Sequence, residues 1–166
     1  MATLKTSRKP LLIDLPLLDA VSAEARGNTR RRKNRNFHDD DAALAHRLLN
    51  AIEPGSYLLP HRHLDANKDE TMIVLRGCLG VIFFDDVGEV EQTVELTPQG
   101  FVCGVDIPHG VYHTILALAP GTVIIEAKAG PYLPLTDAER APWAPAEGTS
   151  AAAAYARTLS ERFARR

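Results

Sequence analysis

The sequence has little cysteine. Cys78 and Cys103 are its two cysteines; they lie 25 positions apart and form no CxxC pair. A single domain of 166 residues buries about 70% of the surface that its unfolded chain exposes, so it does not need a disulfide scaffold. A redox pair is the alternative interpretation of the two thiols. We expect two reduced thiols and a cytoplasmic protein.

Long hydrophobic runs are also missing. Apolar runs such as residues 81–84 fall far short of the roughly 20 apolar residues that span a bilayer. Residues 1–16 carry three basic side chains and a short apolar stretch, but no small-residue cleavage site of a secretory signal follows. We therefore expect no membrane partner.

Neither sign of charge dominates the chain. Its 19 basic and 21 acidic side chains give a formal net charge of −2, which disfavours nucleic acid as a partner. Residues 26–35 nevertheless include six basic side chains, with Phe37 as the aromatic residue beside them. This run is interpreted either as a clamp for phosphate groups or as a solvated arm.

The pattern of apolar residues predicts one domain with three parts: a helical and basic extension (1–50), a β-rich core (51–132), and an arm with a helix (133–166). Residues 14–26 have helical spacing with Asp14 as N-cap, and residues 40–51 fit a second helix. The core holds seven β-rich segments separated by turn signals: 57–63, 71–77, 79–85, 90–96, 101–108, 111–118 and 122–128. Many short strands without helices between them predict an antiparallel sandwich or barrel.

The arm contains several prolines, which prevent regular secondary structure until the Ala-rich stretch 150–166, where a docked or frayed helix is expected. Trp143 is the one tryptophan of the sequence and lies in the middle of this arm. A disordered tail seldom carries such an anchor, so we expect the indole to pack on the β-rich core.

Three histidines and a glutamate carry the chemistry: His61, His63, Glu70 and His113. Side chains two positions apart in a strand point to the same face, so His61 and His63 should project together. Glu70 opens the next strand, and His113 begins a later one. Nitrogen and oxygen ligands without thiolate suit one divalent transition metal ion, such as Zn, Fe, Mn or Ni, and leave positions open for water or substrate.

These residues stand in two motifs that resemble those of the cupin superfamily. GSYLLPHRH and the residues after it match the first motif at Gly55, His61, His63, Glu70 and Gly77, with six residues between His63 and Glu70 where the motif has three or four. GFVCGVDIPHGVYHTILA matches the second at Pro108, Gly110 and His113, with Gly100 displaced and Ala117 in place of the motif's Asn.

Over about residues 30–148 the chain resembles the WbuC-type cupin-fold metalloproteins. The resemblance implies a mainly β fold, a small antiparallel cupin β-barrel or jelly roll, here with N-terminal helices and a C-terminal arm. It also implies a link to the synthesis of O-antigen and other surface polysaccharides, without a settled reaction.

Further polar residues are candidates for the same site. Glu126 and Lys128 share a face of the last strand; if that face is inward, they form an acid–base pair near the metal, and if outward, a solvated ion pair. His38, which follows Asn36 in a stretch like the polar patch of the family, is a candidate at the mouth of the site. His46 in the second helix and His109 are interpreted as surface residues or as outer parts of the site, and Tyr132 as a core aromatic residue or a hydrogen-bonding residue at the rim of the site.

We expect a metal-dependent enzyme that acts on a small polar molecule, such as a sugar, a sugar nucleotide or another phosphate-bearing compound, by proton transfer as in isomerisation or epimerisation. A metal-dependent oxygenase and a non-catalytic binding module remain as alternatives, because cupin folds host many reactions. A second copy of the chain, in a homodimer, is a further expected partner.

Overall fold

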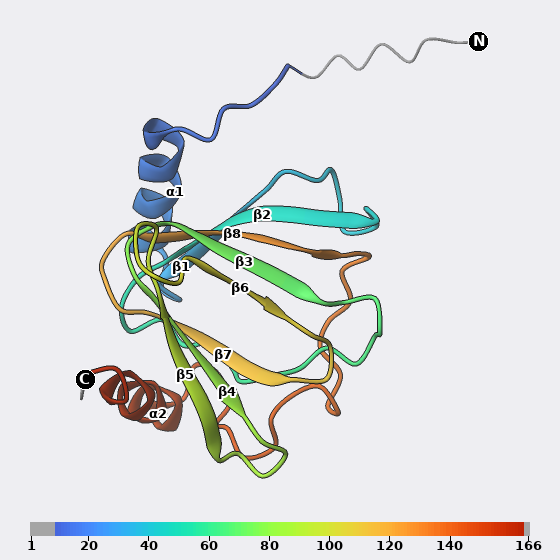
Figure 1. Cartoon of the computed structure of the whole chain (residues 1–166), viewed down its shortest axis with the longest axis vertical. Helices are drawn as coiled ribbons and strands as arrows, with labels where there is room; N and C mark the ends of the chain where they lie inside the picture. The colour runs from blue at the N-terminus through green and yellow to red at the C-terminus, as the bar shows by residue number, and fades with distance from the viewer. Residues whose placement is uncertain (1–8, 165–166) are drawn as a thin grey trace.

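Eight strands and two helices make up residues 9–164, which are the residues described by this computed structural model (Figure 1). In chain order they are α1 (Leu15–Gly27), β1 (Arg32–Asn36), β2 (Ala45–Ile52), β3 (Glu70–Arg76), β4 (Leu79–Phe84), β5 (Val90–Leu96), β6 (Gly104–Ile107), β7 (Tyr112–Ala117), β8 (Thr122–Ala129) and α2 (Ser150–Glu161). None of the helices in this range is long and apolar enough to cross a membrane.

The strands form two antiparallel sheets. One has the order β1-β2-β8-β3-β6 and the other the order β5-β4-β7. Between them lies the main core, made of apolar side chains from both sheets: Ile52, Met72, Val74, Leu79, Val81, Leu96, Ile107, Ile115, Ala117 and Ile124. This confirms the predicted mainly β, antiparallel architecture.

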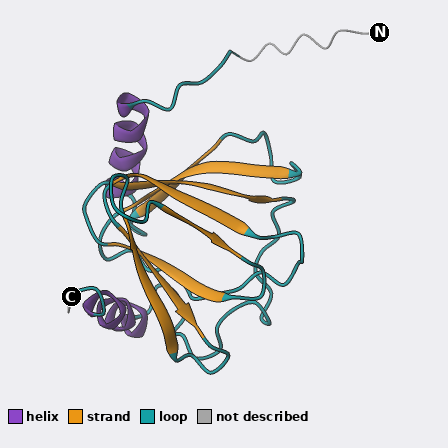
Figure 2. Ribbon diagram, in the orientation of Figure 1, coloured by secondary structure: helices purple, strands orange, loops and turns teal. Residues whose placement is uncertain are grey.

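The helices lie on the outside of this sandwich (Figure 2). The N-cap side chain of Asp14 accepts a hydrogen bond from the backbone N–H of Leu17, which begins α1 as predicted. Buried residues of α1 pack on the outer face of the five-stranded sheet, against Leu49, Ala51 and Val123. Helix α2 packs through Leu159 on the three-stranded sheet.

The arm before α2 docks as the sequence predicts. The Trp143 ring lies 4.8 Å from that of Tyr112 in an edge-on arrangement and 6.2 Å from that of Phe84. Both cysteines are free thiols, and burial raises the pKa of Cys78 to about 11.

The helix predicted over residues 40–51 is wrong, because this stretch carries strand β2. Backbone pairing with β1 on one side and β8 on the other holds β2 inside the sheet. Its side chains are buried on both faces from Leu48 to Ile52, and such a continuous apolar run resembles a buried helix in sequence. Among the described residues before the predicted core, the structure therefore has one helix, α1, and β2 runs across the boundary drawn at residue 51.

The strand predicted over residues 57–63 is also absent. Pro60 interrupts it, since proline cannot donate a ladder hydrogen bond. What remains is a bridge in which His61 and His113 exchange backbone hydrogen bonds of 3.0 and 2.9 Å. Two histidines from distant parts of the sequence are thereby fixed side by side.

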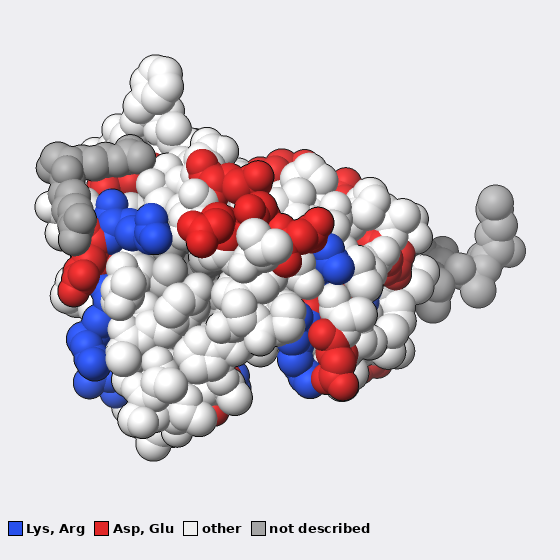
Figure 3. Space-filling model, turned by 90° about the horizontal axis from the view of Figure 1, so that it is seen from below, with Lys and Arg blue, Asp and Glu red and all other residues white. Residues whose placement is uncertain are grey.

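The basic run makes intramolecular contacts. Arg30 and Arg32 both bind the carboxylate of Glu147 in the arm, at 2.9 and 2.7 Å, and Arg31 donates to the carbonyl of Pro54. On the face seen in Figure 3, basic and acidic groups lie beside one another instead of forming a continuous basic surface. Arg30 and Arg32 are therefore engaged within the chain, and the phosphate clamp stays a prediction.

Candidate metal centre

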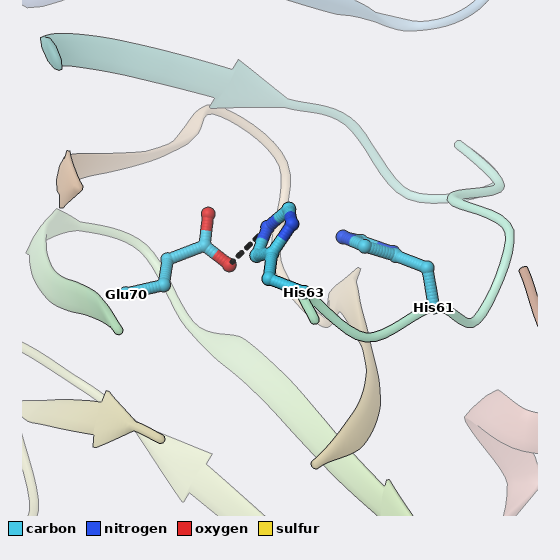
Figure 4. A group of neighbouring side chains, drawn as sticks. All are labelled: His61, His63 and Glu70. Atoms are coloured by element: carbon cyan, nitrogen blue, oxygen red, sulfur yellow. Dashed lines mark ion pairs between the residues drawn. The ribbon is translucent and has the colours of Figure 1, made fainter. Parts of the chain in front are cut away.

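His61, His63 and Glu70 form a group that could hold a metal ion. Their potential ligand atoms all lie within 4.8 Å of one another. Figure 4 shows the Glu70 carboxylate directed at the His63 ring, with the His61 ring on the other side of His63. Glu70 begins β3, while both histidines lie in the connection between β2 and β3.

The two bridged histidines have the same local arrangement. Nδ1 of His61 lies 2.9 Å from the carbonyl oxygen of Leu59, and Nδ1 of His113 lies 3.0 Å from that of Val111. A carbonyl oxygen can only accept, so Nδ1 carries the proton in each neutral ring and Nε2 keeps its lone pair. Metal-binding histidines commonly use their other ring N–H in this way.

His113 approaches the group through Glu70. Its Nε2 lies 3.2 Å from Oε2 of Glu70, and both residues are about 2% exposed. A neutral His113 with its proton on Nδ1 turns a lone pair toward a carboxylate oxygen, so two acceptors face each other. A cation between them, either a proton or a metal ion, would remove the repulsion.

His63 provides a second sign that the donor set fits a metal. Its Nε2 is buried and has no hydrogen-bond partner among residues 9–164, although Oε2 of Glu70 lies 3.7 Å away. A buried polar atom without a partner costs stability. A divalent ion at this position would satisfy the orphaned nitrogen together with Glu70.

The electrostatics keep these groups in their metal-binding forms. Burial, reinforced by the neighbouring His113, lowers the pKa of His61 to about 3, so the ring is neutral near pH 7. Burial alone would raise the pKa of Glu70. The positive charge of Lys128, with a smaller contribution from the nearby His113 and His63 rings, outweighs burial and holds that pKa well below its ordinary value.

Glu126 and Lys128 lie on the inward face of β8, beside this group. Lys128 Nζ lies 2.8 Å from Oε1 of Glu70 and 2.7 Å from Oε1 of Glu126. Burial, with the negative charge of Glu70, raises the pKa of Glu126 to about 7. Burial would lower the pKa of Lys128, but the two carboxylates outweigh it and raise that pKa above its ordinary value.

Two pockets open onto this network and share His46, Lys128 and Tyr132. The first, of about 180 Å³, is lined by His61, His63, Lys68 and an apolar wall that includes Leu133 and Leu135. The second, of about 260 Å³, is polar and includes Asn34, Asn36, His38, Asp41 and Glu126. Strand pairing brings residues of the second pocket together. Asn36 on β1 is paired with Leu48 on β2, and Leu48 is paired with Glu126 on β8.

The structure brings most sequence candidates to this region and changes the interpretation of one. His38 lines the second pocket, and its ring stacks on that of His46 at 3.9 Å. His46 is not on the surface of a helix; it is 5% exposed on β2, paired in register with Lys128. His109 is exposed and bonded to Asp69 instead.

Lys68 is the residue that sequence reasoning missed. It is 9% exposed and lines the first pocket beside His61 and His63. The signal was present in the sequence, since Lys68 lies in the stretch by which the connection from His63 to Glu70 exceeds the cupin motif.

Comparison with known proteins gives a family and a fold. Residues 13–96 match a family described as a domain of unknown function, DUF6016. This range includes His61, His63 and Glu70 but ends before His113. Among curated proteins, none matches this chain.

Solved structures similar to this chain include cupins. A cupin superfamily protein from Desulfitobacterium hafniense is 16% identical, with a TM-score of 0.52 over 72% of this chain and 93% of that one. A conserved protein of unknown function from Streptococcus pyogenes is 10% identical, with a TM-score of 0.51 over 80% and 98%. KdgF from Halomonas sp. is 17% identical, with a TM-score of 0.48 over 60% and 80%. The likeness to the Desulfitobacterium hafniense protein shows that this chain has a cupin fold. The resemblance to the WbuC-type proteins stays a prediction.

Proposed function

We propose that this chain, which belongs to the DUF6016 family, is a metal-dependent enzyme that moves a proton on a small polar substrate such as a sugar or sugar nucleotide. Isomerisation and epimerisation are the reactions that fit best, and the WbuC-type resemblance suggests surface-polysaccharide synthesis as their setting. The proposal rests on one observation: a partly buried group of metal-ligand atoms directly contacts an acid–base pair, through Lys128 between Glu70 and Glu126.

The proposed ligands are the grouped His61, His63 and Glu70, together with His113, whose Nε2 lies 3.2 Å from Oε2 of Glu70. When bound, a divalent ion supplies the polarisation of a substrate carbonyl or hydroxyl oxygen. The rings of His61 and His113 and the carboxylate of Glu70 need little rearrangement to receive the ion. The Nδ1 hydrogen bonds hold the two rings in place, and the contact with Lys128 holds the carboxylate.

Glu126 is the proposed group that takes and returns the substrate proton. Its carboxylate lines the polar pocket, where Oε2 also lies 3.4 Å from the amide nitrogen of Asn50. Lys128 holds Glu126 and Glu70 in a fixed relation and keeps two carboxylates stable in a region poor in water. His38, across the same pocket, is the proposed contact for substrate hydroxyl groups.

The size and lining of the pockets support a small polar substrate. About 180 and 260 Å³ hold the volume of about six and nine liquid water molecules at ~30 Å³ each. Spaces of this size admit a small molecule. Amide, imidazole and carboxylate groups in the second pocket match the donors and acceptors of hydroxyl groups.

Metal content and solvent-proton exchange together test the proposal. Protein purified without added metal should contain close to one transition metal ion per chain by elemental analysis. His61→Ala and His63→Ala should lose most of it, whereas the exposed His109→Ala is the matched control and should keep it. In D₂O, the wild type should incorporate deuterium into at least one of a panel of sugars and sugar nucleotides. Glu126→Gln should keep the metal and lose the exchange.

Two results would contradict the proposal. Full metal content in His63→Ala would mean that the ligands are wrongly assigned. Bound iron with dioxygen consumption and without deuterium incorporation would favour the oxygenase instead.

A further inference from the structure

The pocket beside the metal ligands is lined by two lysines with different surroundings. Lys128 donates to Glu70 and Glu126 and has both carboxylates within 2.8 Å. Nζ of Lys68 has no hydrogen-bond or ion-pair partner among residues 9–164, although its side chain is largely buried. The stem of the side chain is covered, whereas Nζ keeps contact with solvent, since it is not one of the fully buried polar atoms in this range that lack a partner, and Asp65 is a charged neighbour. Lys68 therefore offers donors that nothing in the described chain uses.

The connection that carries Lys68 is a folded turn. The backbone N–H of Lys68 donates to the carbonyl of Asp65 at 2.9 Å, and the Asp65 side chain accepts from the backbone N–H of Asn67 at 2.9 Å. Asp69 accepts from the backbone N–H of His109 at 2.8 Å, which ties the end of the connection to the turn before β7. The side chain of Lys68 thus leaves a backbone that is fixed on both sides.

This turn contains the residues by which the connection exceeds the usual spacing. Six residues separate His63 from Glu70, where the cupin motif has three or four. The longer connection leaves the ligands together and places the Lys68 ammonium group at their pocket, with the carboxylates of Asp65 and Asp69 in the same connection. The other side of that pocket is apolar and includes Ala129, Pro131 and Leu133.

We propose that Lys68 is an anion-binding residue of this pocket, so that the substrate carries an oxyanion, a carboxylate or a phosphate, within reach of both Lys68 and the metal ligands. The inference rests on the proposed function for the position of the substrate. The apolar wall then packs against the carbon skeleton, and the polar pocket across Lys128 receives hydroxyl groups. A neutral sugar leaves Lys68 unpaired and is the weaker ligand.

The test compares three probes of similar size: glycolate, its neutral analogue glycolamide, and inorganic phosphate. Calorimetric titration is done on EDTA-treated and on metal-loaded protein, with metal content measured in each sample. In Lys68→Met the dissociation constant for the bound oxyanion should rise at least about tenfold, because a charge-assisted hydrogen bond is lost. Glycolamide binding should stay unchanged. Lys68→Arg should restore most of the affinity, and Lys33→Met, at an exposed lysine on β1, is the control.

Each outcome has a meaning. Tight phosphate and weak glycolate binding identifies phosphate as the oxyanion, and the reverse identifies a carboxylate. Equal oxyanion affinity in Lys68→Met and wild type, or no binding of either oxyanion by the wild type, overturns the inference. Failure of the proposed function is read separately, as a lack of metal in the wild type, because the EDTA-treated protein still reports the contribution of Lys68.

Discussion

Around Glu70, two of the three histidines, His61 and His113, are each held by one ring nitrogen and leave the other for the site. His61 and His113 use the same device, a hydrogen bond from Nδ1 to the carbonyl oxygen two residues earlier. The device needs only a local backbone conformation, so it is available in two unrelated parts of the chain. Ring orientation is thus set before any metal arrives, which is the condition for tight binding without large rearrangement.

Gly88 allows a residue-scale prediction about the arm. Its φ is +93°, and a Cβ atom there would lie 2.6 Å from the Trp143 ring. Gly88→Ala should lower the free energy of unfolding by ~2–4 kcal/mol, from backbone strain and from crowding of the indole. Thermal unfolding should show a melting temperature lower by about 4–16 °C.

Gly148→Ala is the control for this substitution. Gly148 has a similar φ of +84°, but nothing lies within 4 Å of the position of its Cβ. This variant should show only the strain of the left-handed conformation, ~1–2 kcal/mol. Equal losses in the two variants would mean that Trp143 does not pack on Gly88.

The site residues that stand in a regular motif could be predicted from the sequence, whereas those outside a motif could not. His61, His63 and Glu70 stand at motif spacing, and the structure brings them together. Lys68 lies in a polar stretch where a lysine is ordinarily a solvated residue; the length of the connection was the one sequence signal, and the burial of the side chain in the folded turn could not be predicted from it. His46 was misread because its interpretation depended on the element that was predicted around it.

At the scale of elements, the C-terminal arm is tied to the edge strand of the larger sheet by charge. Glu147 accepts hydrogen bonds from Arg30 and from Arg32, the first residue of β1. Burial alone would raise the pKa of Glu147, but the two guanidinium groups outweigh it and lower the pKa below its ordinary value. The contacts join residues more than a hundred positions apart in sequence.

This pairing predicts a pH-dependent effect of Glu147→Gln. A carboxyl group with a lowered folded pKa adds stability that is present above its unfolded pKa, ~4.3, and is lost as pH falls through the folded value. At pH 7 the variant should be less stable by ~1 kcal/mol, a modest figure because the group is partly exposed. The difference in melting temperature from wild type should shrink below ~pH 4.

Glu91→Gln, at an exposed position of β5, is the control and should change stability little at any pH. A Glu147→Gln deficit that stays constant down to pH 3 would show that the ion pair is not its source.

Strands with turns around them were predictable, whereas β1 and β2 were not. The segments from β3 to β8 each have a short apolar run between turn signals, and each forms a strand. Strand β1 has the sequence RKNRN, without an apolar residue, and exists because β2 supplies its backbone partners. Strand β2 is buried on both faces, which removes the alternation that marks a strand in sequence.

At the scale of the whole molecule, the candidate metal centre spans the two sheets. Glu70 belongs to the five-stranded sheet, His113 belongs to the three-stranded sheet, and His61 and His63 lie in a connection that is bridged to β7. A metal bound by all four residues would therefore join both layers of the sandwich. Its binding free energy would add to the stability of the whole domain, and not only to that of a loop.

Metal removal should consequently lower global stability. A ligand that binds only the native state at 100 times its dissociation constant adds ~2.7 kcal/mol, which corresponds to about 5–11 °C in melting temperature for a chain of this size. We expect EDTA-treated protein to melt lower by this amount in calorimetry, with a single transition, and to recover on addition of the native metal in proportion to the logarithm of its concentration. In His63→Ala the metal-dependent shift should disappear, while circular dichroism keeps the β-sheet spectrum because the core between the sheets is intact. Loss of the spectrum on EDTA treatment would instead make the metal a requirement for folding, and an unchanged melting temperature would place the metal outside this junction of the two sheets.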